Sequence, residues 1–274
     1  MLDHGLVFRL IAVASALRRR RFRKVRGVAL QVAVLCLVKV GVHAAGLETL
    51  SISPLFSAIV ASTVFLLGFL LSGVLTDYKE SEKIPAELAT ALETLTLELR
   101  AIPLYRPQAH VQPALQGVAV LGQQVHAWLL DRVGLEDLLQ RYWQVHAEVV
   151  AASAQFTGDA STLRGRLMQC LEIVLQRVNR VQTIRDTTFV PLVYWMAHSA
   201  AVLLIAGLVL ATSQNLVESV FFLAVIAFLV ILLLRLIDDI DNPFGAASAD
   251  SAEDVSLEIL QRTVERLEAA LTSL

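Results

Sequence analysis

Residues 64–78 read VFLLGFLLSGVLTDY, an almost unbroken apolar run that ends at Asp77. Three other runs in the chain have the same character, and each of the four is long enough to cross the roughly 30 Å hydrocarbon core of a bilayer. Helices in the core of a soluble protein carry a polar stripe, which these runs mostly lack. The sequence therefore predicts four transmembrane helices, within Val28–Leu50, Leu55–Leu75, Phe189–Leu210 and Val217–Ile237.

The overall composition agrees with a membrane protein. Hydrophobic residues make up 56% of the 274 residues, and the mean hydropathy is +0.63. Both values exceed those of an ordinary globular protein. Cys36 and Cys170 lie far apart in the sequence and suggest neither a disulfide nor a metal framework.

The basic residues are distributed unevenly and indicate an orientation. Seven of the nine residues from Arg18 to Arg26 are basic, whereas the connections around Glu48 and Glu218 contain no Lys or Arg. The positive-inside rule then places both termini and the long middle segment in the cytoplasm, with the protein in the cell membrane as a multi-pass chain. Leu6–Leu17 has the length of a signal peptide, but its positive charges follow the apolar stretch, which favours an interfacial amphipathic helix.

The segment between the second and third spans is predicted to be helical, and the protein to be all-α. Its first helix has an apolar stripe through Ala89, Leu92, Leu95, Leu99 and Ile102. Pro103, Pro107 and Pro113 indicate an irregular connector. Further helices are expected near Ala114–Val133, Leu135–Phe156, Ser161–Arg185 and Glu253–Leu271. The predicted regions are a basic segment (1–27), two spans (28–75), a cytoplasmic helical region (76–188), two spans (189–237) and a cytoplasmic C-terminal segment and helix (238–274).

Motifs for catalysis are not evident. The six histidines show no metal-ligand spacing, and the sequence has no phosphate loop or nucleophile elbow. We therefore expect neither an enzyme nor a nucleic-acid-binding protein. Lys39 and His43 share one helix face within the first span, where ionisable residues often mark a functional site. Snorkelling towards the membrane surface or contact with a neighbouring helix explains them equally well.

A group of carboxylates follows the fourth span. Asp239, Asn242 and Asp250 are weak candidates for oxygen ligands of Ca²⁺. The spacing is not that of an EF-hand, which favours a solvated helix end closed by Asn242-Pro243.

The opening stretch carries a stripe of unusual composition. Ala61, Phe65 and Phe69 recur every four residues and so lie near one face of the helix, and Ser57, Ser72 and Gly73 extend this stripe. Contact with lipid or with the helix bundle explains the stripe. Alternatively, several copies of the helix surround an axis and stack the stripe as apolar rings, a constriction of the kind that gates by dewetting.

Three motifs resemble those of the bestrophins, a family of pentameric ion channels. Phe65–Phe69 followed by Thr76 is similar to the second span of that family, Asp186–Tyr194 to its entry into the third span, and Asn242–Gly245 to its Asn-Pro-Phe-Gly after the fourth. The resemblance covers about Arg18–Asp254. It implies a pentamer of four-span subunits continuous with a cytoplasmic helical bundle. It also implies an axial pore with a neck lined by Ala61, Phe65 and Phe69, and a second, cytoplasmic constriction for which Leu163 is a candidate.

The sequence also departs from the family at three points. Ala61 stands where members often have a larger apolar residue, which implies a wider ring. Asp77-Tyr78 replaces an Arg followed by an aromatic residue, which bears on anion preference. Ala246–Ala249 interrupts the acidic run that holds Ca²⁺ in eukaryotic members, so no cofactor is expected.

These features together predict a passive homopentameric channel for chloride or other small monovalent anions in the lipid bilayer. The alternatives are a channel permeable to monovalent cations and a membrane-anchored helical scaffold without a pore.

Overall fold

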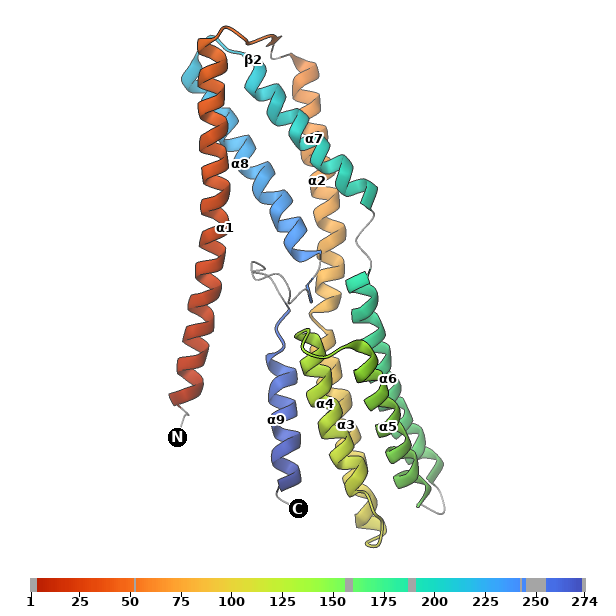
Figure 1. Ribbon diagram of the computed structural model, residues 1–274. Coiled ribbons are helices and arrows are strands. Elements are labelled where there is room, and N and C mark those ends of the chain that lie inside the picture. The colour runs from red at the N-terminus through yellow and green to blue at the C-terminus, as the bar shows by residue number, and fades with distance from the viewer. Residues whose placement is uncertain are drawn as a thin grey trace. The chain divides into compact units, whose positions relative to one another are not determined.

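The computed structural model describes residues 4–51, 53–155, 160–186, 191–241, 243–244 and 255–272 (Figure 1). Side chains are described from residue 24 onward and not for residues 160, 161 and 272. The chain divides into two compact units. The first, called the membrane unit below, comprises Met1–Tyr78, Thr188–Asn242 and Asp250–Glu253. The second, called the helical unit, comprises Lys79–Thr187, Pro243–Ala249 and Asp254–Leu274.

Four long helices make up the membrane unit. They are α1 (His4–Ala44), α2 (Pro54–Ser81), α7 (Pro191–Leu210) and α8 (Leu216–Ile240). By length and composition, the segments long and apolar enough to cross a membrane are Lys24–Ala44, Pro54–Tyr105 (which begins with α2), Pro191–Leu210 and Leu216–Ile240. All four helices contribute to one apolar core, which includes Val28, Leu67, Leu204 and Ala227. The predicted four-span arrangement is therefore present.

Helix α1 is longer than its apolar part. It runs without a break from His4 to Ala44 (Figure 1), so the predicted boundary at residue 27 is not an interruption of the helix. The local sequence allows this continuity, because no Pro occurs between His4 and Ala44 and a single glycine such as Gly27 costs a helix only about 1 kcal/mol.

A short strand pair joins the two connections at one end of the membrane unit (Figure 1). Strand β1 (Leu50–Ser51) pairs in parallel with β2 (Ala211–Thr212), Leu50 opposite Ala211. The Thr49 amide donates to the Leu210 carbonyl at 3.1 Å just before the pair. The chain is predominantly helical as predicted, and within the described residues this two-residue ladder is the one piece of strand.

The described part of the helical unit consists of five helices: α3 (Ile84–Tyr105), α4 (Gln112–Leu129), α5 (Leu135–Ala154), α6 (Ala160–Asp186) and α9 (Glu258–Thr272). Helix α3 packs against α4, α6 and α9. The stripe predicted for its core is confirmed, because Ala89, Leu92, Leu95, Leu99 and Ile102 are all buried.

The connector after α3 begins later than predicted. Pro103 lies inside α3, which continues to Tyr105. The ring of a proline removes one backbone hydrogen bond, but two further residues complete the last turn before the chain leaves the helix at Arg106. Pro113 opens α4 near its first position, where a missing N–H is tolerated. Helix α9 begins at Glu258 and not near Glu253 as predicted.

Arg185, near the end of α6, fixes the end of α4. Its guanidinium donates to the Leu129 and Phe244 carbonyls, both at 3.1 Å, and lies 3.0 Å from the Asp131 carboxylate. It also stacks 4.8 Å from the centre of the Trp128 ring. Asp131 has a positive φ of 54°, a left-handed conformation that Asp tolerates better than most residues. Arg185 therefore ties the turn after α4 to the Pro-Phe segment that follows the fourth span.

Candidate functional site

Helix α2 has two faces of different character. Leu67, Leu70 and Val74 are buried in the core of the membrane unit, and Thr63 is buried beside them. The Thr63 hydroxyl donates to the Ile59 carbonyl at 2.9 Å, so this polar group is satisfied within its own helix. At about 100° per residue, the buried side chains centre on the side of the helix opposite Phe65.

The aromatic stripe lies on the other face. Phe65 is 77% exposed and Phe69 is 61% exposed in the single chain. Ala61, Ser57 and Ser72 are exposed as well, and Gly73 is half-buried. A methyl group added at Gly68 would meet nothing within 4 Å. The structure thus brings the predicted neck residues together on one open, mostly apolar surface of α2.

The other residues predicted to lie near the pore are Asp77 and Leu163. Asp77 is exposed near the end of α2. Its direction differs by about 80° from that of Phe69, so it stands at the edge of the stripe. Leu163 is half-buried near the start of α6 and belongs to the helical unit.

Of the weak metal candidates, Asp239 lies within the residues that the structure describes. Asp239 forms an ion pair with Lys24 of α1 at 2.6 Å, and its side chain is 10% exposed. Asn242 and Asp250 lie outside the described residues. Within the described part of the chain, no group of three or more His, Cys, Asp and Glu side chains has the geometry to hold a metal ion.

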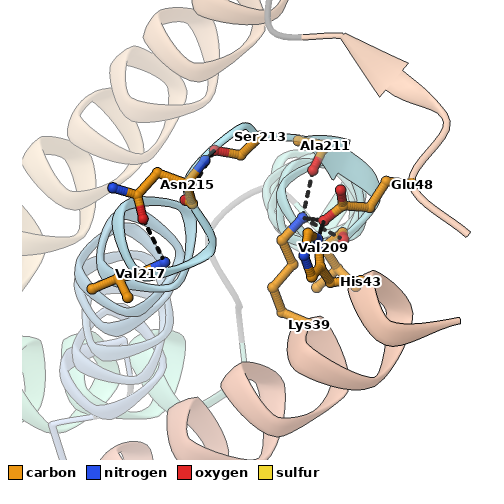
Figure 2. Close-up of polar contacts among 8 residues, drawn as sticks. All are labelled: Lys39, His43, Glu48, Val209, Ala211, Ser213, Asn215 and Val217. Atoms are coloured by element: carbon orange, nitrogen blue, oxygen red, sulfur yellow. Dashed lines mark hydrogen bonds and ion pairs between the residues drawn. The ribbon is translucent and has the colours of Figure 1, made fainter. Parts of the chain in front are cut away.

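Among the side chains described in the membrane unit, Lys39 is the most deeply buried charge, with 0% exposure. Its ammonium group lies 2.6 Å from the Glu48 carboxylate and donates to the carbonyls of Val209, at 3.2 Å, and Ala211 (Figure 2). Lys39 therefore contacts a neighbouring helix, α7, which is one of the alternatives predicted for it. The two carbonyls belong to the end of α7 and to β2, where helical carbonyls lack partners and the helix dipole favours a cation.

His43 completes a polar cluster, which we call the Lys39 cluster and define as Lys39, His43 and Glu48. Its Nδ1 lies 3.2 Å from the same Glu48 carboxylate, and its side chain is 40% exposed. The hydrogen bond from Lys39 lowers the pKa of the Glu48 carboxyl, and His43 adds to this effect against the cost of burial. Sequence reasoning found Lys39 and His43 but not Glu48, which becomes their partner only because the connection after α1 folds back along the helix.

A second polar group lies between α1, α7 and α8 and was not predicted. Arg235 of α8 donates to the Gln31 side chain of α1 at 3.1 Å. Asp238, one turn later, lies 3.8 Å from His198 of α7. Charged residues inside an apolar span are the sequence signal that would have drawn attention to them.

The geometry defines a class of protein, a helical membrane protein with four spans and an attached helical body. A family model for the bestrophin-like domain matches residues 27–249. The chain therefore belongs to the bestrophin-like family, whose members are known as ion channels. Among curated protein sequences, none matches the chain.

Solved structures show the same fold. Two variants of a bacterial bestrophin homologue from Klebsiella pneumoniae superpose with TM-scores of 0.69 and 0.72, at 17% and 15% sequence identity. Each alignment covers 92% of this chain, and the two cover 100% and 98% of the homologue. The crystal structure of that homologue phased with zinc gives a TM-score of 0.68 at 15% identity, covering 92% of this chain and 98% of the other. At such identities the comparison establishes the fold.

Proposed function

We propose that this chain forms a homopentameric, passive channel for chloride or other small monovalent anions. Phe65 and Phe69 of five α2 helices form its narrow neck, with Ala61 as a wider ring at one end. The three rings span eight residues of helix, which is about 12 Å. Both termini and the helical unit lie in the cytoplasm, as the distribution of basic residues favours.

The observation that carries this proposal is the open aromatic face of α2. Two phenylalanines more than half exposed lie opposite the buried face of the same helix, so the fold of one subunit gives them no partner among the described residues that pack on α2. If several α2 helices surround a common axis, the phenylalanines form apolar rings around it, and such rings can act as the constriction of a pore. The family supports the same arrangement, since bestrophin homologues are oligomeric membrane channels.

The choice of anion over cation rests on the character of the stripe. The positive edges of aromatic rings favour a partly dehydrated anion, and no charged side chain lies between Ser57 and Ser72. The exposed carboxylate of Asp77 favours cation permeation, because it lies one to two helical turns beyond the stripe. Its position at the edge of the stripe leaves the neck itself uncharged.

The test is single-channel recording from purified protein in planar bilayers. Replacing both aromatic neck residues, Phe65→Ala and Phe69→Ala, removes the apolar barrier, so we expect conductance to rise several-fold or selectivity to relax. Reversal potentials in asymmetric salt distinguish chloride from cation flow. Asp77→Asn should then shift the reversal potential towards that of chloride if the Asp77 carboxylate attracts cations.

A matched control uses aromatic residues on another helix. Phe221 and Phe222 of α8 are 60% and 50% exposed, and the double replacement by Ala should leave conductance unchanged. Equal effects of the two double variants would mean that Phe65 and Phe69 merely contact lipid. Absence of currents from both wild type and the Phe65/Phe69 variant, together with the mass of a monomer or dimer, would instead support the non-conducting scaffold.

A further inference from the structure

A groove on the membrane unit lies apart from the aromatic stripe of α2. It has a volume of about 640 Å³ and is lined by residues of α1, α7 and α8. This volume is within the range of sites that bind small molecules. Its apolar part is formed chiefly by Leu30 and Val34 of α1 and Ile231 and Leu234 of α8. We call it the α1–α8 groove.

The polar end of the groove carries both signs of charge. The Arg235 guanidinium and the Asp238 carboxylate are three residues apart on α8 and so project from the same side of the helix. Arg235 donates one hydrogen bond within the described part of the chain, to the neutral Gln31. A guanidinium has five N–H donors, so most of its capacity is available to an anion.

The Asp238 carboxylate likewise has capacity to accept further hydrogen bonds. Its partner His198 lies 3.8 Å away, beyond the range of a hydrogen bond, and both side chains are about half exposed at 48% and 50%. The backbone of α1 passes close to Arg235, since a Cβ placed at Gly27 would stand 3.6 Å from the Arg235 guanidinium nitrogen Nη1, an ordinary van der Waals contact. The α1–α8 groove therefore has a cation and an anion side by side at one end, next to its apolar part.

We propose that the α1–α8 groove binds one phospholipid with a primary ammonium headgroup, namely phosphatidylethanolamine. The Arg235 guanidinium receives the phosphate, the Asp238 carboxylate receives the ammonium, and one acyl chain lies along Leu30, Val34 and Ile231. A two-carbon linker separates phosphate from ammonium in this lipid, which suits a donor and an acceptor about one helical turn apart. A second subunit is a poorer occupant, because it would have to supply both an anion and a cation to a membrane-embedded contact.

The depth of the site is consistent with a headgroup. Arg235 stands five residues before the end of α8 at Ile240, which is about 8 Å along the helix. Gln31 stands seven residues after Lys24, where the apolar part of α1 begins. The long side chain of arginine reaches from such a depth towards the interface. The lipid belongs to the leaflet at the basic end of α1.

Binding of defined lipids to the full-length protein tests the proposal. The protein, kept in its own oligomeric state, is titrated with phosphatidylethanolamine, phosphatidylcholine or phosphatidylglycerol of identical acyl chains, and bound lipid per subunit is counted by native mass spectrometry. Wild type should bind phosphatidylethanolamine about tenfold more tightly than the other two, the effect of one charge-assisted hydrogen bond. Asp238→Asn should abolish the preference over phosphatidylglycerol, and Arg235→Gln should weaken binding of all three.

Glu218→Gln provides the control, since this carboxylate is exposed in the first turn of α8 at the opposite end of the helix. It should leave all three affinities unchanged. Equal affinities of wild type for the three lipids, or unaltered binding by Arg235→Gln, would overturn the proposal. A fall in oligomer mass of Arg235→Gln without any change in lipid binding would overturn it too, and would assign the groove to a neighbouring subunit. The result does not depend on whether the protein conducts ions.

Discussion

The two ends of the membrane unit carry charge in opposite ways. At the end with the β1–β2 pair, Lys39 is fully buried and its ammonium group is bonded to one carboxylate and two carbonyls. At the other end, Arg235 is exposed and bonded to one neutral amide. A buried charge needs nearly complete pairing to be tolerated, whereas an exposed one near the interface does not. The first cation holds the fold together, and the second has capacity left for a ligand.

Lys39→Met should give the largest effect on stability, because it leaves the Glu48 carboxylate beside carbonyl oxygens without its main partner. Removing one member of an ion pair whose other member is buried is strongly destabilising. We expect a clear fall in the midpoint of thermal unfolding, followed by intrinsic fluorescence in detergent.

The double variant Lys39→Met, Glu48→Gln is the matched control for this prediction. Because it removes both charges, it should recover part of the lost stability. If Lys39→Met unfolds at the wild-type temperature, the pair does not stabilise the fold.

Arg185 provides an intermediate case, in the helical unit. Its side chain is 14% exposed, and burial lowers the pKa of its guanidinium while the carboxylates of Asp131 and Asp186 oppose this shift. Arg185→Gln should destabilise the protein by about 2 kcal/mol, since hydrogen bonds to charged groups are worth roughly that much.

Arg185→Lys sharpens the prediction, because lysine keeps the charge but lacks the planar fork that reaches several oxygens. It should recover only a minor part of the stability. Full recovery by lysine would show that charge alone matters at this position. Both variants are compared with wild type by denaturant unfolding of the full chain.

The smallest effect concerns pH. The pKa of Glu48 is lower in the folded protein than its ordinary value of 4.5, so the unfolded chain takes up this proton first as the pH falls. The stability that Glu48 contributes is therefore present above the ordinary pKa and is lost as the pH drops through the folded value.

The comparison with Glu48→Gln isolates this contribution, since all other carboxylates titrate in both proteins. The difference in unfolding temperature between wild type and variant should be constant near neutral pH and shrink below about pH 4. A difference that grows with acidification would contradict the assigned role of Glu48.

Much of the fold was predictable, because it depends on local patterns. Apolar runs of membrane length gave the four spans, and the spacing of Leu92, Leu95 and Leu99 gave the buried side of α3. The four-residue spacing of Phe65 and Phe69 likewise predicted a common face, and their exposure agrees with that. Their role as a neck stays a prediction.

The polar contacts were not predictable, because each depends on segments far apart in the sequence. Asp239 looked like a metal ligand by composition, yet its carboxylate pairs with Lys24 on α1. The contacts of Arg235 and Asp238 become apparent only in the folded chain, where α1 and α7 pack against α8. A charged residue in an apolar span predicts that a polar partner exists, but the identity of that partner depends on how the helices pack.

The position of Trp128 has a practical consequence for spectroscopy. Its ring is 2% exposed, whereas Trp143 and Trp195 are 61% and 69% exposed, and these are the three tryptophans of the chain. With Trp143 and Trp195 replaced by Phe, and with excitation at a wavelength that the four tyrosines do not absorb, the emission would come from one indole held against a guanidinium. The last turn of α4 thus supplies the helical unit with a natural fluorophore, able to report whether that unit is assembled.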